Sequence, residues 1–184
     1  MFARMPVSSL VHGQRPGRLL QLSRCFASLT AALLLTTQAI YAQEAVVPVA
    51  DAEALFTSAD PKLQANKQVA YHIVRELLEA GHWELADRYL TERYLQHNPN
   101  AASGRAGVVH FFVDVLKVKP TPIPEKIKTP IVAVLAEGDL VTVVYPRLVE
   151  VGDDPAKRYT TTWFDMWRIK DGKADEHWDP ATRN

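Results

Sequence analysis

The sequence predicts an α+β domain in which three N-terminal helices pack against a strongly curved antiparallel sheet. Between residue 61 and about residue 116, apolar residues recur at three- and four-residue spacing, which is the helical period. From residue 131 onward the chain is rich in β-branched and aromatic residues and is interrupted by short turn sequences, which is typical of hairpin-linked strands. Helices followed by such strands indicate a helix layer on a sheet. With 184 residues, 47% of them hydrophobic, the chain can build one domain with a substantial core.

Residues 1–42 are predicted to be a secretory signal peptide. They contain four arginines and no acidic residue, and an uncharged apolar run, residues 26–42, ends in a small residue. We expect cleavage near Ala42 and a periplasmic or secreted protein. The run is too short for a comfortable membrane span, so no stable span is expected after cleavage. An organelle transit peptide is the alternative, because such peptides are also rich in Arg and Ser and poor in acidic residues.

Two features of the composition exclude classes of chemistry. The single cysteine, Cys25, would be removed with the leader, which excludes disulfides and thiol catalysis in the mature chain. The formal net charge is zero, but removal of the four leader arginines leaves 17 of the 21 basic residues against all 21 acidic ones. A mildly acidic domain is not expected to bind nucleic acid.

The first helix is expected to begin at Asp60 and Pro61. Asp60 can cap the helix with its carboxylate, Pro61 suits the first turn, and Gly81 is expected to end the helix. Residues 43–60 before it are predicted to be a spacer without chemistry, so the domain is expected to span residues 61–184.

Two further helices are predicted before the sheet begins. The second is short, over residues 82–90, and the third opens at residues 103–107 and continues to about residue 116. Lys119 followed by Pro120 ends it. Residues 94–99 between them are predicted to be a short extended piece that ends in a turn.

The strands are predicted to form a meander. Strands over residues 131–136, 140–149 and 157–169 are joined by short turns, and the turn at Asp171 and Gly172 leads into the last strand.

The strand over residues 157–169 carries the main candidate for function. Side chains alternate across a strand, so Trp163, Asp165 and Trp167 share one face. A carboxylate in so aromatic a strand must be paired, protonated or functional. His177 and Asp179 share a face of the last strand, and the tight turn brings His177 close to Asp165. We therefore expect a carboxylate and an imidazole on facing walls of an apolar pocket.

At this point four sequence stretches together resemble the SnoaL-like polyketide cyclase family of the nuclear transport factor 2-like superfamily. They are GHWELADRYL (residues 81–90), YLQHNP (94–99), SGR (103–105) and WFDMWRIKDGK followed by EHWD (163–179). The resemblance covers about residues 62–181. It implies a cone-shaped α+β barrel with an apolar pocket, commonly dimeric through the sheet.

The resemblance also implies a chemistry. In characterised cyclases of this family a pocket aspartate is the general acid/base for an intramolecular aldol closure, without metal or cofactor. Asp165 matches that aspartate, and His177 and His97 match pocket histidines of the family. The chain differs from the related ketosteroid isomerases, because Val74 stands where they have an oxyanion tyrosine and Asn98 stands near their general base. Steroid isomerisation is therefore not expected.

The predicted ligand is a small apolar molecule with a carbonyl group. Aromatic walls suit such a ligand, and burial disfavours the charged form of a carboxylic acid, so one group could both accept and return a proton. Beyond the catalytic candidates, the predicted ligand-binding residues are Trp163, Trp167, Asn98, Asp179 and Tyr145, although Tyr145 could equally lie at the surface or in an interface.

Two expectations about partners complete the prediction. No two histidines are spaced as metal ligands, so no metal and no cofactor are predicted. The alternative to an enzyme is a non-catalytic small-molecule-binding or dimerisation module of the same fold, forming a homodimer through the sheet, in which Asp165 is a structural ion partner.

Overall fold

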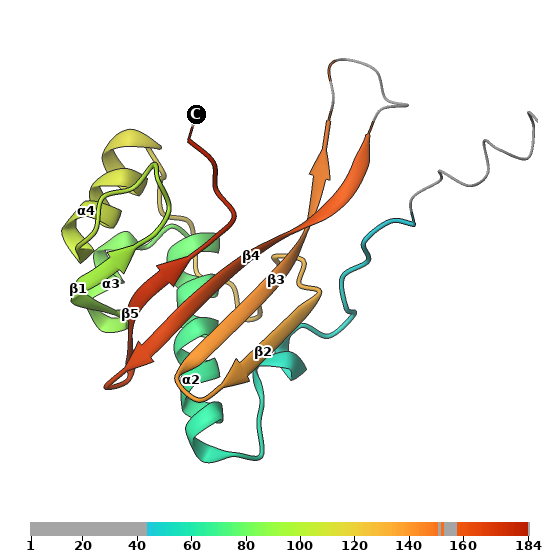
Figure 1. Cartoon of the computed structure of the whole chain (residues 1–184), viewed down its shortest axis with the longest axis horizontal. Helices are drawn as coiled ribbons and strands as arrows, with labels where there is room; N and C mark the ends of the chain where they lie inside the picture. Colours follow the sequence, from blue (N-terminus) through green and yellow to red (C-terminus); the bar gives the residue numbers. More distant parts are fainter. Residues whose placement is uncertain (1–43, 151, 153–157, 184) are drawn as a thin grey trace, which may run out of the picture. The chain divides into compact units, whose positions relative to one another are not determined.

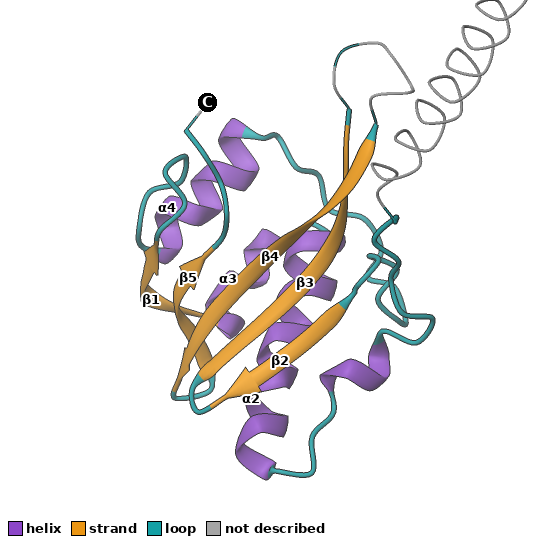
Figure 2. Ribbon diagram, turned by 45° about the vertical axis from the view of Figure 1, so that its right-hand side comes forward, coloured by secondary structure: helices purple, strands orange, loops and turns teal. Residues whose placement is uncertain are grey.

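The computed structural model describes residues 44–150, 152 and 158–183, and the predicted leader lies outside them. The chain from residue 44 onward forms one compact unit. Its helices lie on one face of a curved five-stranded sheet, which confirms the predicted α+β class (Figure 1, Figure 2). Among the described residues, no helix combines the length and the apolar character needed to cross a membrane.

The first helix begins where the sequence predicts. Helix α2 spans Pro61–His72, and the carboxylate of Asp60 caps it by accepting a hydrogen bond from the backbone N–H of Leu63 at 2.9 Å. The helix continues in wider, π-type turns over Ile73–Glu79. Gly81 follows with φ +77°, where a Cβ atom would also lie within 3.0 Å of the Lys119 carbonyl oxygen, so glycine is required there.

The region predicted as a second helix divides into several short elements. A single 3₁₀ turn over Trp83–Leu85 leads into the one-turn helix α3, Ala86–Tyr89. Strand β1, Leu90–Gln96, follows at once. Leu90 therefore ends in the sheet and not in the helix, because pairing with a distant strand overrides the local helical pattern.

The third helix is close to its predicted position. Helix α4 spans Arg105–His110 and continues in π-type turns over Phe111–Val115. Its buried residue Val108 and the neighbouring Phe112 pack against the domain core.

The sheet is curved, as predicted, but it is mixed and open, whereas the sequence predicted an antiparallel sheet and the family resemblance implied a cone-shaped barrel. The remaining strands are β2 (Ala133–Glu137), β3 (Leu140–Val149), β4 (Tyr159–Lys170) and β5 (Lys173–Trp178). The strand order is β1-β5-β4-β3-β2, so β1 and β2 form the two edges. The four later strands pair antiparallel, as the meander predicted, but β1 pairs parallel with β5. The helix α4 and the meander separate these two strands in sequence, so no local turn signals their pairing.

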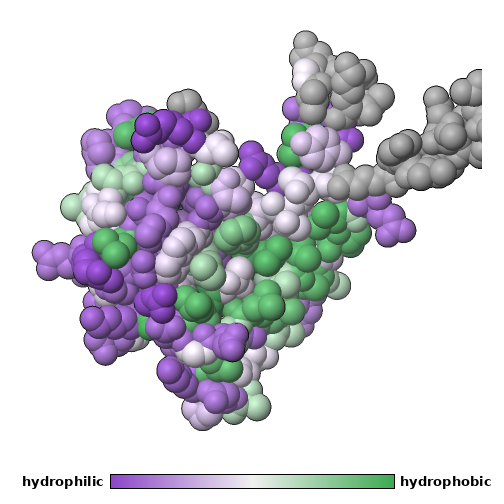
Figure 3. Space-filling model, viewed as in Figure 1, coloured by the Kyte–Doolittle hydropathy of each residue, from purple (hydrophilic) through white to green (hydrophobic). Residues whose placement is uncertain are grey.

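The two faces of the sheet have different environments. Toward the helices, Val141, Val143 and Trp167 are at most 1% exposed and form the centre of the core. On the other face, Leu135 and Phe164 are exposed. Apolar residues gather over β2 and β3 on this outer face (Figure 3).

The segment predicted as a spacer is attached to the domain in its described part. The backbone N–H groups of Val46 and Val49 donate hydrogen bonds to Thr160 and Ile131, at 2.8 and 2.9 Å. Phe56, in a short 3₁₀ turn over Glu53–Phe56, is 1% exposed and belongs to the core. The core therefore begins before the predicted start of the domain at residue 61.

Candidate functional site

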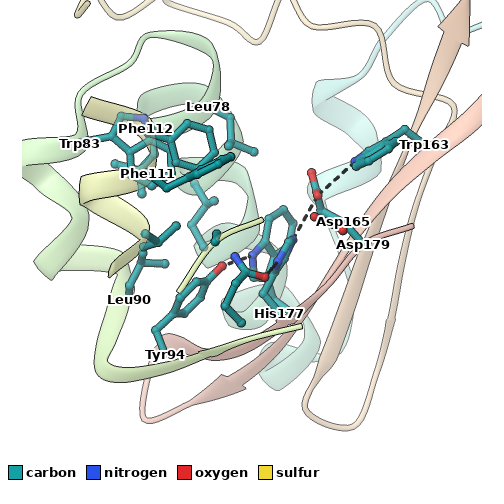
Figure 4. Close-up of a pocket in the computed structure, with 16 residues that line it drawn as sticks. Leu78, Trp83, Leu90, Tyr94, Phe111, Phe112, Trp163, Asp165, His177 and Asp179 are labelled. Atoms are coloured by element: carbon teal, nitrogen blue, oxygen red, sulfur yellow. Dashed lines mark hydrogen bonds and ion pairs between the residues drawn. The ribbon is translucent and has the colours of Figure 1, made fainter. Parts of the chain in front are cut away.

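An apolar cavity with one polar end lies between the sheet and the helices. It has a volume of about 190 Å³. Figure 4 shows Leu78, Trp83, Phe111 and Phe112 gathered on one side and the two carboxylates, of Asp165 and Asp179, on the other. A site of this kind can hold an apolar body while polar groups act on one end of it.

Asp165 and His177 form the centre of the polar end. Asp165 lies on β4 and His177 on β5, and Nε2 of His177 is 3.1 Å from Oδ1 of Asp165. Their side chains are only 13% and 8% exposed. The indole N–H of Trp163, two residues before Asp165, donates to the same oxygen at 3.4 Å. The structure therefore brings together the carboxylate, the imidazole and the aromatic neighbour that the alternation of β4 predicts.

Gln96, at the end of β1, holds the other side of the imidazole. Its side-chain oxygen Oε1 lies 2.6 Å from Nδ1 of His177 and also accepts a hydrogen bond from the backbone N–H of Asn98 at 3.1 Å. The parallel register of β1 and β5 sets Gln96 beside His177. Gln96 was not among the predicted site residues, because the pairing of β1 with β5 was not predicted, although Gln96 lies within one of the family-like stretches.

Asn98 and Asp179 form a second polar pair beside the first. The amide of Asn98 donates to Oδ2 of Asp179 at 2.7 Å, and the backbone N–H of Ala181 donates to Oδ1 at 2.9 Å. Asp179 lines the cavity, whereas Asn98 does not line it and contacts the site through its hydrogen bond to Asp179.

Trp167 and Tyr94 also line the cavity. Trp167 is 1% exposed and its indole N–H donates to the Tyr94 hydroxyl at 3.1 Å. Burial raises the pKa of Tyr94 far above its usual range, so the phenol stays neutral. Both rings lie against His177, with centroids 5.6 and 6.2 Å from the imidazole. Tyr94 was another lining residue that the sequence analysis missed.

Tyr145 lies on the interior side of β3, next to Asp165. Burial, reinforced by the nearby Asp165 carboxylate, raises the pKa of Tyr145 well above 10. Its buried hydroxyl has no hydrogen-bond partner within the described part of the chain. Tyr145 does not line the cavity itself. Trp163, which pairs with Tyr145 across the strands, does line it, and the guanidinium of Arg147 lies over the Trp163 indole at 4.8 Å.

His97 lies outside the cavity, contrary to the pocket position expected for it. Its Nε2 is 2.9 Å from Oε1 of Glu176, and its ring stacks on Trp178 with centroids 5.1 Å apart. Gln96 faces the cavity, and consecutive side chains at the end of a strand point to opposite faces, so the next residue points away. The structure offers His97 no contact with Asp165 through which it could act in catalysis.

Three side chains come nearest to a metal-binding arrangement. One potential ligand atom each of Asp165, His177 and Asp179 lies within 4.8 Å of the others. Both oxygens of Asp179 already accept hydrogen bonds from Asn98 and Ala181, and His177 is in direct hydrogen-bond contact with Asp165. We therefore describe the group as a hydrogen-bonded network, and the absence of a metal stays a prediction.

The fold and this site place the chain in a class of small α+β pocket proteins, and the sequence match identifies the family. Residues 72–177, more than half of the chain, match the model of the SnoaL-like domain. The protein belongs to this family, as the sequence motifs predicted. No curated protein matches the sequence significantly.

Several solved structures are similar to this chain at low sequence identity. A candidate polyketide cyclase from Acidithiobacillus ferrooxidans is 16% identical, with 67% of this chain and 89% of that chain covered and a TM-score of 0.47. A candidate SnoaL-like polyketide cyclase from Jannaschia sp. CCS1 is 14% identical, with 67% and 91% covered and a TM-score of 0.47. A protein of unknown function with a cystatin-like fold from Xanthomonas campestris is 17% identical, with 62% and 88% covered and a TM-score of 0.43. The family assignment rests on the domain match and not on these distant likenesses.

Proposed function

We propose that the cavity binds a small apolar molecule with a carbonyl group and that Asp165 moves a proton on the carbon next to that carbonyl. The observation that carries this proposal is a carboxylate, paired with an imidazole, at the polar end of an aromatic cavity. General acid/base catalysis requires a group within hydrogen-bond reach of the reacting atom and shielded from bulk water. Aldol cyclisation and isomerisation both begin with this proton removal.

The free oxygen of Asp165 is the group that would act. Both hydrogen bonds that the described residues make to this carboxylate fall on Oδ1, from Trp163 and His177. We assign Oδ2 to the ligand, with the hydroxyl of Tyr145, which interacts with the same carboxylate, close by. In the forward step the C–H bond breaks, an O–H bond forms on Oδ2, and the electron pair moves to the carbonyl oxygen as an enolate. The same O–H can then protonate the new alkoxide or return the proton to carbon.

The cavity limits the size of the ligand. Its volume of about 190 Å³ lies below the roughly 300–1,000 Å³ of sites for drug-sized ligands. A compound with one or two rings fits this volume better than an extended polycycle.

A thermal-shift screen of the purified chain tests the proposal. We expect small cyclic ketones and related carbonyl compounds to raise the melting temperature, because a ligand that binds only the folded state stabilises it by about 2.7 kcal/mol at 100 times its dissociation constant. The hydrocarbons of the same shape serve as controls, and Phe112→Ala should weaken the effect by removing one wall. If no carbonyl compound stabilises the protein, the binding proposal fails.

A dimerisation module is the second candidate function, and the outer face of the sheet favours it. Leu135, Leu148 and Phe164 are 59%, 57% and 36% exposed there. We propose that a second copy of the chain covers this face and expect Leu135→Lys with Phe164→Lys to give a monomer by light scattering after size exclusion. Val115→Lys, which also changes an exposed apolar residue but lies outside the sheet, should leave the dimer intact. A monomeric wild-type chain at micromolar concentration would contradict the proposal.

We also propose that the protein is exported and cleaved near Ala42, on the composition of residues 1–42. Mass spectrometry of the product from its native cell decides this, because a chain that still begins at Met1 would refute the cleavage.

A further inference from the structure

The hydrogen bonds around His177 determine which of its two nitrogens carries a proton. We propose that Gln96 is a positioning residue that fixes His177 with its proton on Nδ1, so that Nε2 and Asp165 share a single proton between them. The catalytic meaning of this inference rests on the proposed function, whereas the protonation pattern itself does not.

The Gln96 amide has one defined orientation. Asn98 points its backbone N–H at Oε1 of Gln96 from 3.1 Å. A backbone N–H can only donate, so the atom it faces must be the amide oxygen and not the amide nitrogen. The side chain therefore cannot be turned over without losing this bond.

The protonation of His177 follows from that orientation. The same oxygen lies 2.6 Å from Nδ1 of His177. An amide oxygen can only accept, so Nδ1 must be the donor and must carry a proton. A neutral imidazole has one N–H, and Nε2 is then left with a bare lone pair.

The contact with Asp165 requires one further proton. Nε2 lies 3.1 Å from Oδ1 of Asp165, and two lone pairs at that distance would repel each other. A proton between them removes the repulsion, either on the imidazole, which makes an imidazolium and a carboxylate, or on the carboxyl group, which makes two neutral groups. Both arrangements have zero net charge, which lowers the cost of burial beside Trp167 and Tyr94.

This arrangement prepares Asp165 for its proposed role. The shared proton holds Oδ1 against His177 and leaves Oδ2 directed to the cavity as the base. Without Gln96, the neutral ring can move its proton to Nε2 and donate it to the carboxylate. The pair then has a net negative charge, and the imidazole loses the hydrogen bond on Nδ1 that orients it, so we expect proton transfer to fall by about tenfold.

Nuclear magnetic resonance of the histidine nitrogens tests the inference without any ligand. The full chain is labelled with ¹⁵N-histidine, and His177 is assigned by the loss of its signals in His177→Gln. We expect Nδ1 of His177 to carry a hydrogen in the wild type and Nε2 to be bare or to share its proton. In Gln96→Met the hydrogen should move to Nε2, whereas Gln96→Glu, which keeps an acceptor, should retain it on Nδ1. Gln68→Met, a change of the same kind on α2 outside the cavity, should leave the pattern unchanged.

The outcomes separate this inference from the proposed function. A wild-type His177 with a bare Nδ1 overturns the role of Gln96, even if a ketone binds and exchanges its protons. A protonated Nδ1 that moves in Gln96→Met supports it, and this reading holds even if no ligand is found. An unchanged pattern in Gln96→Met also overturns it, and the wild-type measurement decides the question alone if that variant does not fold.

Discussion

Asp165→Asn is expected to reduce proton transfer by about 10²- to 10⁴-fold while leaving the domain folded. The amide is nearly the same size as the carboxylate, and with its nitrogen in the place of Oδ1 it can donate to the bare Nε2 of His177 while losing only the long hydrogen bond from Trp163. It cannot accept a proton from carbon. The rate is measured as deuterium uptake from D₂O at the carbon next to the ligand carbonyl, and folding is measured from the melting temperature.

The surface of the protein provides a matched control for this change. His110 and Asp114 form a second histidine–aspartate pair, at 2.9 Å, with side chains 67% and 59% exposed. Asp114→Asn removes the same charge from the same kind of pair and should change neither deuterium uptake nor the melting temperature. If Asp165→Asn unfolds the protein instead, Asp165 is a structural ion partner and the catalytic proposal loses its central residue.

Trp167→Ala is expected to lower the free energy of unfolding by about 3–5 kcal/mol. Trp167 is 1% exposed, lies between Val141 and His177 in the register of the sheet, and donates the hydrogen bond to Tyr94. The change opens a cavity in the core and leaves the buried hydroxyl of Tyr94 without its donor, and both effects destabilise the folded state.

Trp178→Ala is the control for the loss of an indole. Trp178 is only partly buried and stacks on His97 at the outer face, so we expect a smaller loss. Urea denaturation of both variants gives the two free energies. Equal losses would contradict the central place of Trp167 in the core.

The sequence predicted the later strands well because their signals are local. The boundaries of β3 agree with the prediction to the residue, and those of β4 within two residues, since period-two alternation and short turns determine them. The same alternation placed Asp165 beside Trp163 and Trp167 on the interior face. The tight turn after β4 likewise placed His177 on the neighbouring strand, where it pairs with Trp167, two residues from Asp165.

Strand β1 and the position of Gln96 were not predicted, because both depend on contacts between distant segments of the chain. Strand β1 was predicted as helix and short extended piece because its pairing with β5 leaves no local trace. Two consequences follow from that one omission. Gln96 was not recognised as a neighbour of His177, and His97 was expected in the cavity although its position directly after β1 turns it outward.

A crystal structure of the chain with its most stabilising carbonyl compound tests the central claim most directly. We predict that the carbon next to the ligand carbonyl lies about 3–3.5 Å from Oδ2 of Asp165, the separation of reacting atoms in a near-attack geometry. The ligand's apolar part should then rest against Phe111 and Phe112. A ligand bound on the outer face of the sheet, or bound in the cavity with its carbonyl directed away from Asp165, would contradict the claim.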